Sequence, residues 1–180
     1  MLLTHMIIQK HIEKKIQRDY FFIEGVLEID ADYFLKKIDQ GVQEKDNMNF
    51  KTAIKGKMTP YKYFLEDPIF VKLVNNFVDY LDENINLTRY QLGDAWGYKI
   101  GNQEHTTFHE HFPALWSGAI YLNDNEQILE FPEINKGVKP SVGKFVLFSS
   151  FLEHGCKKNM SNNLKYGLSF NMYNHNVFNE

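Results

Sequence analysis

The hydrophobic pattern of this chain changes its period about halfway along. In the first half, apolar residues recur every three or four positions, which is typical of amphipathic helices. One helix is predicted through about Gln43, and either Asp30 or Asp32 can cap its first turn. A second helix is predicted after Asp67 and Pro68, because proline suits the first turn of a helix. Helices therefore dominate the first half.

In the second half, from about Leu87 onward, short β-prone runs alternate with turn signals. The predicted strands are Leu87–Leu92, Ala95–Ile100, Thr106–His111, Trp116–Leu122, Ile128–Phe131, Lys144–Phe148 and Tyr166–Met172. The turn signals between them are Gly93-Asp94, Gly101-Asn102, Asn123-Asp124-Asn125 and Ser161-Asn162-Asn163. Short strands, or a strand and a turn, are also expected at Tyr20–Ile23 and Val26–Ile29.

This order of elements predicts an α+β protein that is mainly β. Helices followed by many short strands favour a β-sandwich or jelly roll with the N-terminal helices packed on one sheet. At 180 residues the chain suits a single domain, 1–180. Within it we expect residues 1–86 to form a mixed support and residues 87–175 to form the jelly-roll core.

Composition and charge narrow the class of protein. The net charge is −3, which gives no electrostatic signal for nucleic-acid binding. No segment reaches the roughly 18 apolar residues that cross a bilayer, and charged residues from Lys10 onward interrupt the short apolar N-terminus. The single cysteine, Cys156, cannot form an intramolecular disulfide. We therefore expect a soluble cytoplasmic protein without a membrane or nucleic-acid partner.

Three histidines carry the strongest chemical signal. If Phe108–Phe112 is a strand, His109 and His111 project from one face, because side chains alternate along a strand. His154 follows a later apolar run and can complete the set. Two close ligands and one distant ligand, with open positions left over, are typical of non-haem iron oxygenases. The usual middle ligand is a carboxylate, and here that position is a histidine.

Two further residues are candidates for binding an anionic ligand. Lys165 begins the last β-prone run, and a cation inside a sandwich is costly unless an anion pairs with it. A ligand carboxylate would supply that anion, but a solvated strand edge would also suit the lysine. Tyr121 can likewise be a core residue or can offer its hydroxyl to such a carboxylate.

A zinc protease is a weaker interpretation of the same region. His105 lies four residues before His109, as in a helical zinc-binding motif, but no glutamate follows His105. Thr106 and Thr107 are β-branched and disfavour a helix at this point. We therefore favour the strand-based site.

Several motifs in the second half resemble one known family. The order and spacing of these motifs are similar to those of the 2-oxoglutarate/Fe(II)-dependent oxygenases, in particular the compact phage and bacterial group related to prolyl hydroxylases. The matching pieces are His109, His111, Trp116, Ser117, Gly118 and Tyr121, then Pro140, Gly143 and Phe148, then Leu152–Gly155, and finally Ser169–Asn171.

The resemblance implies a double-stranded β-helix, which is a variant of the jelly roll. It implies Fe(II) bound by His109, His111 and His154, which would be the catalytic centre. The co-substrate 2-oxoglutarate would bind beside the iron, and O2 would be the second co-substrate. The carboxylate of 2-oxoglutarate that lies farther from the iron would contact Lys165 and Tyr121. Ser169 and Asn171, in the closing motif, would complete the co-substrate site.

Two positions depart from the family pattern. His111 stands where an aspartate is usual, which leaves the metal site more positive by one charge. Lys165 stands where an arginine is usual, and lysine is a point charge without the two-pronged geometry of a guanidinium group. Both departures concern charge at the expected site.

The sequence thus predicts an Fe(II)- and 2-oxoglutarate-dependent hydroxylase of the phage-like group. Its substrate is unidentified, and a prolyl or other amino-acid residue, in a peptide or a small molecule, is compatible. One alternative is a cupin-like metalloenzyme with three histidine ligands that does not use 2-oxoglutarate. Another is a catalytically inactive jelly roll that acts as a binding or structural module.

Overall fold

The computed structural model describes residues 18–43, 52–85 and 90–174 of the chain. Two helices and ten strands lie in these ranges. The helices are α1 (Ala31–Gln43) and α2 (Pro68–Ile85). The strands are β1 (Phe22–Val26), β2 (Lys57–Met58), β3 (Tyr90–Ile100), β4 (Thr106–His109), β5 (Trp116–Tyr121), β6 (Leu129–Phe131), β7 (Lys136–Val138), β8 (Lys144–Ser149), β9 (His154–Cys156) and β10 (Lys165–Asn174).

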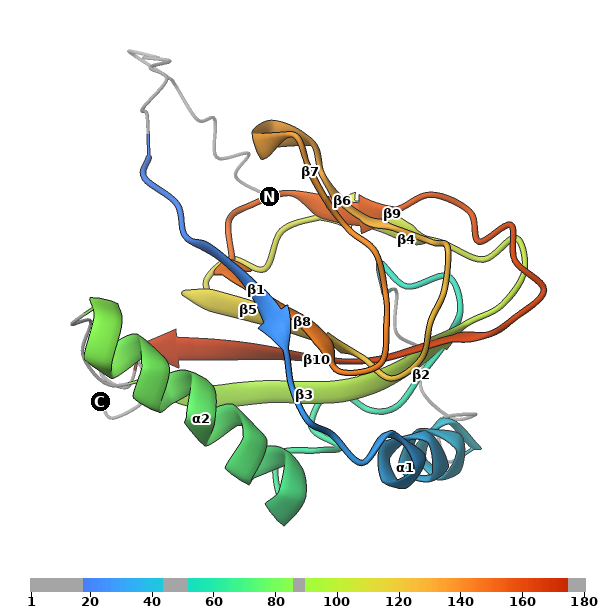
Figure 1. Ribbon diagram of the computed structural model, residues 1–180, viewed down its shortest axis with the longest axis horizontal. Coiled ribbons are helices and arrows are strands. Elements are labelled where there is room, and N and C mark those ends of the chain that lie inside the picture. The colour runs from blue at the N-terminus through green and yellow to red at the C-terminus, as the bar shows by residue number, and fades with distance from the viewer. Residues whose placement is uncertain (1–17, 44–51, 86–89, 175–180) are drawn as a thin grey trace, which may run out of the picture.

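The strands form two antiparallel sheets. The larger sheet has the order β1-β8-β5-β10-β3-β2, and the smaller has the order β4-β9-β6-β7. Figure 1 shows the smaller sheet above the larger one and both helices below it. Successive strands cross between the sheets, as in a jelly roll with helices packed on one sheet. The predicted fold class is therefore confirmed.

Both predicted helices are confirmed, and local chemistry explains where they begin. The carboxylate of Asp67 accepts hydrogen bonds from the backbone amides of Ile69 (3.2 Å) and Phe70 (3.0 Å), so Asp67 caps α2. The same carboxylate accepts a hydrogen bond from the Tyr33 hydroxyl at 2.6 Å. Asp30 accepts one from the amide of Tyr33 and caps α1. These contacts join the two helix starts.

The strand predictions were less accurate. The turn expected at Gly93-Asp94 is wrong, because β3 continues through both residues opposite a bulge between Asn171 and Met172. The first residues of the predicted strand Leu87–Leu92 lie outside the described residues. Strands β7 and β9 are only three residues long, and the apolar pattern did not indicate them.

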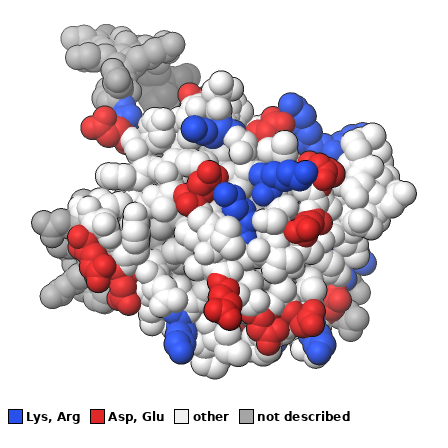
Figure 2. All heavy atoms as spheres, in the orientation of Figure 1, with Lys and Arg blue, Asp and Glu red and all other residues white. Residues whose placement is uncertain are grey.

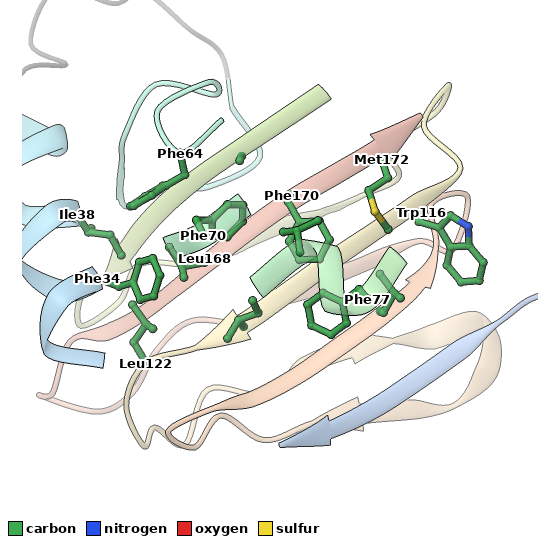
Figure 3. Close-up of a cluster of buried hydrophobic side chains, with 14 of the residues drawn as sticks. Phe34, Ile38, Phe64, Phe70, Phe77, Trp116, Leu122, Leu168, Phe170 and Met172 are labelled. Carbon is green, nitrogen blue, oxygen red and sulfur yellow. The ribbon is translucent and has the colours of Figure 1, made fainter. Parts of the chain in front are cut away.

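One face of the large sheet packs against the helices and forms the main core. Phe170 of β10 lies 5.7 Å from Phe77 and 5.9 Å from Phe70, measured between ring centroids, and both partners belong to α2. Figure 3 shows these rings with Phe34 and Ile38 of α1 on the same side of the sheet. Aromatic rings thus fill the layer between the helices and the sheet.

The opposite face of the large sheet looks toward the small sheet, and its side chains form rows across β5, β10 and β3. The register partners are, in order along the sheet, Ser117-Asn171-Asp94, Ala119-Ser169-Trp96, Tyr121-Gly167-Tyr98, and then Lys165 with Ile100. Successive rows are about 6.6 Å apart, because two residues separate them along each strand. This ladder of inward positions defines the space between the sheets.

The surface carries no dominant sign of charge in the view of Figure 2, where acidic and basic side chains are interspersed. Neither described helix is long and apolar enough to cross a membrane.

Phe170→Ala should lower the free energy of unfolding by about 3–5 kcal/mol, because it leaves a cavity between β10 and α2. Urea denaturation followed by circular dichroism would measure this loss. The matched control is Tyr80→Ala on the exposed side of α2, where 46% of the side chain is accessible and the change should stay within about 0.5 kcal/mol. Equal losses in the two variants would show that the aromatic layer is not the main core.

Candidate metal centre

The structure brings His109, His111 and His154 together between the two sheets. One nitrogen from each ring lies within 4.8 Å of the others, which is close to the span of one coordination sphere. His109 and His154 are direct register partners of the antiparallel pair β4–β9. Such partners have neighbouring side chains, so the backbone ladder itself sets the two imidazoles side by side, with ring centroids 4.5 Å apart.

His111 reaches the group by a different route. The expected strand Phe108–Phe112 is wrong, because β4 ends at His109 and His111 lies in the following turn. The amide of His111 donates to the Ser150 carbonyl, and the His111 carbonyl accepts from the amide of Ala114. Pro113 has no amide hydrogen and cannot extend the ladder. The ring still faces the other two, at 4.7 Å from His109 and 5.0 Å from His154.

Backbone carbonyls fix the tautomers of two of the histidines. Nδ1 of His109 lies 2.8 Å from the Thr107 carbonyl, and Nδ1 of His154 lies 2.9 Å from the Leu152 carbonyl. A carbonyl only accepts, so in each neutral ring Nδ1 carries the proton and donates it. Nε2 of each ring then keeps a free lone pair, which can bind a metal ion between the three imidazoles. This is the arrangement that metal-binding histidines commonly show.

Burial keeps these imidazoles neutral. Desolvation, with a smaller contribution from the neighbouring His109, lowers the pKa of His154 to about 3. Desolvation likewise lowers the pKa of His111 to about 2, with smaller contributions from His154 and His109. The pKa of His109 is also lowered by burial, although hydrogen bonds and the exposed Glu153 oppose the shift. Neutral rings are the form that binds a cation.

A cavity of about 50 Å³ extends from the histidines toward the opposite end of the space between the sheets. Among the predicted site residues, Lys165 and Ser169 line it together with the three histidines. Tyr121 and Asn171 do not line it. No carboxylate of a described residue lines it either, so its only formal charge is on the lysine.

Lys165 lies at the far end of this cavity and is almost wholly buried, with 1% of its surface exposed. Its Nζ donates to the Gln127 carbonyl and to Sγ of Cys156, both at 3.2 Å. Nζ also lies 5.6 Å from the ring centroid of Tyr121. Among described residues no acid forms an ion pair with Lys165, and burial lowers its pKa. A buried cation with only neutral partners is ready to bind an anion.

Two tyrosines lie beside this lysine, and the sequence analysis named only one. The buried hydroxyl of Tyr121 has no hydrogen-bond partner among the described residues. Tyr98, which was not predicted, lines the cavity on β3, and its hydroxyl lies over Gly167, where any Cβ would collide with it. Tyr98 is two residues from Trp96, so strand alternation could have indicated its inward position. Burial raises the pKa of both phenols, so both remain neutral donors.

Asn171 serves a polar network instead of the cavity. Its Oδ1 accepts from Oγ of Ser117 at 2.8 Å, and its Nδ2 donates to Asp94 at 3.4 Å. The Tyr173 hydroxyl donates to the same Asp94 oxygen at 2.7 Å. Ser117 lines the cavity, so Asn171 orients a cavity residue and does not face the cavity itself.

Two other candidates lie elsewhere. Glu110 is exposed and lines a separate hollow with Glu133 and Phe151, so it points away from the histidines. Glu110 follows the end of β4, and its outward position excludes it as a carboxylate ligand of this centre. His105 precedes β4 and borders a shallow outer groove beside Phe108. The helical protease motif is therefore wrong, since residues 106–109 form a strand.

The residues present fit a divalent metal ion and a small dianion. Three neutral nitrogen donors suit iron, zinc, copper or nickel. The buried lysine and the neutral Tyr98 phenol, which both line the cavity, suit a carboxylate at its other end. The donor set contains no acid that would compete for the cation or repel the anion.

Comparison with known proteins shows the same fold in enzymes of one class. No protein-family model matches the sequence, and no curated protein matches it. Among solved structures, the viral collagen prolyl hydroxylase vCPH of Paramecium bursaria Chlorella virus-1, in complex with 2-oxoglutarate, has a TM-score of 0.66 at 15% identity, over 85% of this chain and 94% of that one.

Two other solved structures show the same likeness. A Pseudomonas putida prolyl-4-hydroxylase has a TM-score of 0.64 at 12% identity, over 86% of this chain and 92% of that one. HygX of Streptomyces hygroscopicus, with nickel, 2-oxoglutarate and hygromycin B bound, has a TM-score of 0.58 at 11% identity, over 87% and 83%. These matches confirm the double-stranded β-helix fold over most of the chain.

The three histidines should bind one divalent ion per chain. The variants His109→Ala, His111→Ala and His154→Ala should each weaken Zn²⁺ binding by at least about 100-fold. Removing only a hydrogen-bond partner of a ligand typically lowers metal affinity by about 10–100-fold, and removing the ligand itself should lower it more. Isothermal titration calorimetry with the metal-free protein would measure this. His105→Ala, outside the cluster, is the control and should bind as wild type. Unchanged affinity in the three cluster variants would exclude a metal site there.

The metal-free protein should lose stability as the pH falls below 6.5. Unfolded histidines take up a proton near pH 6.5, whereas the buried rings stay neutral down to about pH 3, so the unfolded state binds more protons in this window. Each such ring lowers the free energy of unfolding by about 1.4 kcal/mol per pH unit. Urea denaturation at pH 6.5, 6.0 and 5.5 would measure the slope. His154→Gln should reduce it, and an unchanged slope would contradict the buried neutral ring.

Proposed function

We propose that this protein is an Fe(II)- and 2-oxoglutarate-dependent oxygenase that hydroxylates its substrate, with O2 as the second co-substrate. One observation carries the proposal: a single cavity has three neutral imidazoles at one end and a buried lysine without an acidic partner at the other. A dicarboxylate with a keto group beside one carboxylate matches both ends. The fold shared with 2-oxoglutarate enzymes supports the same conclusion.

The ion, when bound, would supply the oxidising chemistry by activating O2 with 2-oxoglutarate. His109, His111 and His154 would hold it through one nitrogen each. Lys165 would bind the far carboxylate of the co-substrate, and the hydroxyl of Tyr98, which lines the cavity, would donate toward that carboxylate. The Tyr121 ring, with its centroid 5.6 Å from Nζ, would support the Lys165 ammonium group. Ser169 would contact the co-substrate between the metal end and the lysine end of the cavity.

The chain's remaining residues would exclude water and hold the ligands in place. Phe131 and Phe148 pack against the His154 ring, with centroids 5.6 Å and 4.7 Å away, and shield the metal side of the cavity. The Thr107 and Leu152 carbonyls keep the protons of His109 and His154 on Nδ1. Low polarity around the site strengthens each charge interaction inside it.

The third imidazole changes the charge of the centre. With a carboxylate ligand the protein would offset one of the two positive charges of the ion, and here it offsets none. A dianionic co-substrate would then supply all the compensating charge. We therefore expect strong coupling between the two ligands: bound metal raises the affinity for the co-substrate, and bound co-substrate raises the affinity for the metal by the same factor.

The substrate we propose is an amino-acid residue, for example a prolyl residue. Two of the similar structures are prolyl hydroxylases, and this supports the proposal. HygX, whose structure contains hygromycin B, shows that the fold also serves small molecules. We place the reaction in a reducing cytoplasm, where the one cysteine stays a thiol.

A second candidate is a three-histidine metalloenzyme that does not use 2-oxoglutarate. The observation that favours it is the ligand set itself, which contains imidazoles and no carboxylate. In that enzyme Lys165 would have no co-substrate to bind. A catalytically inactive binding module, the remaining alternative, predicts no metal binding and fails if the histidines bind an ion.

Lys165→Met should abolish tight 2-oxoglutarate binding and leave metal binding unchanged. Methionine keeps the length of the side chain and removes the charge, so co-substrate affinity should fall by about 100-fold or more. Calorimetry with the Zn²⁺-loaded protein would measure affinity, and succinate formation with anaerobically loaded Fe²⁺ would measure turnover. The buried cation has no acidic partner, so the variant should unfold at an equal or higher urea concentration.

Lys158→Met provides the control for this experiment, because Lys158 is exposed on the opposite side of β9. It should bind 2-oxoglutarate as wild type. If Lys165→Met also binds normally, or if wild type binds the metal but neither binds nor decarboxylates 2-oxoglutarate, the three-histidine alternative is favoured.

A further inference from the structure

One buried hydrogen-bond donor in the cavity has no acceptor. Four buried side-chain atoms of described residues lack a hydrogen-bond partner: the hydroxyls of Tyr90 and Tyr121, Oε1 of Gln127 and Nε1 of Trp96. Of these four residues, only Trp96 lines the cavity that holds the histidines. The indole is 4% exposed, so bulk water does not satisfy its N–H.

Trp96 lies at the metal end of that cavity. It shares an inward row with Ala119 and Ser169, two rows before Lys165. Its ring centroid is 6.0 Å from that of His111, the ligand that replaces a carboxylate. The Tyr61 and Trp96 rings pack in an edge-to-face arrangement, with centroids 5.1 Å apart and an interplanar angle of 75°, which holds the indole in its orientation.

A buried donor without an acceptor is costly. Leaving a buried polar group unsatisfied costs about 1–3 kcal/mol, so native proteins rarely keep one without a ligand or a water molecule to meet it. Indole N–H can only donate, which excludes a metal ion or a cationic group as its partner. The missing partner is therefore an acceptor atom that enters the cavity next to His111.

We propose that Trp96 is a ligand-binding residue whose indole N–H donates to an oxygen of the keto-acid end of 2-oxoglutarate. This inference rests on the proposed function and deepens it. Lys165 would bind the far carboxylate, and Trp96 would bind the near end beside the metal position. Together they would fix both ends of the co-substrate, with Ser169 between them on the adjacent strand.

A neutral donor suits this position for an electrostatic reason. The metal end already carries the full charge of the ion, because the histidines contribute none. A second cation there would repel the metal, whereas an indole N–H stabilises an anionic oxygen without adding a full charge. Trp96 would thus orient the near carboxylate or keto oxygen and leave metal affinity unaltered.

The test observes the indole N–H directly. The chain contains two tryptophans, so 15N-labelled protein gives two indole resonances, and Trp116→Phe assigns the one that remains to Trp96. Loading with Zn²⁺ keeps the protein diamagnetic, and 2-oxoglutarate is then added. The Trp96 proton should move to lower field as its hydrogen bond forms. The Trp116 resonance is the internal control, because Trp116 packs in the helix-facing cluster shown in Figure 3.

A binding measurement complements the spectrum. Trp96→Phe keeps an aromatic ring and removes the donor, and it should weaken 2-oxoglutarate binding to the Zn²⁺-loaded protein by about tenfold, or about 1.4 kcal/mol. Zn²⁺ affinity itself should not change. If Trp96→Phe does not fold, the wild-type spectrum still decides the question.

The outcomes separate this inference from the proposed function. If calorimetry shows 2-oxoglutarate binding but the Trp96 resonance does not move, the indole N–H donates elsewhere, for example to the face of Tyr61, and the inference alone is overturned. If wild type binds Zn²⁺ and shows no 2-oxoglutarate binding at all, both the inference and the proposed function are overturned.

Discussion

The register of β10 between β5 and β3 determines both the core and the candidate site. On one face of β10, Leu168 and Phe170 pack against the helices, and on the other face Lys165 and Ser169 line the cavity. Side chains alternate with a period of two, so a shift of one residue would exchange these faces. The shift would place a lysine among aromatic rings and phenylalanine in the cavity. The aromatic layer under α2 therefore keeps the polar cavity in position.

The same geometry explains why the interior between the sheets tolerates polar groups. Desolvation lowers the pKa of His111 and His154, so burial favours their neutral forms and reduces the cost of enclosing them. What remains is a set of donors and lone pairs without enough protein partners. Such a set stabilises the folded chain less than an apolar interior would, and it is useful where ligands supply the missing interactions.

Much of the fold and part of the site could be predicted from the sequence. Helix periodicity and the proline at Pro68 located α2 correctly, because both are local signals. The three histidines were found from spacing, yet the reason given for His111 was wrong, since a turn and not a strand positions it. Strand β9 depends on pairing between distant segments, which a single sequence does not reveal. Tyr98 was missed although strand alternation with Trp96 could have indicated it. Tyr121 and Asn171 matched family motifs and occupy inward strand positions, but neither side chain lines the cavity.

The position of His111 in a turn has a consequence for how such a centre can change over evolution. His109 and His154 are tied to each other by the β4–β9 ladder, whereas His111 is held by loop contacts with Ser150 and Ala114 through its backbone. Its side chain makes none of the hydrogen bonds that maintain the sheets. One ligand position is therefore separable from the scaffold, and exchange of a carboxylate for an imidazole there alters the chemistry of the centre while the architecture around it is inherited intact.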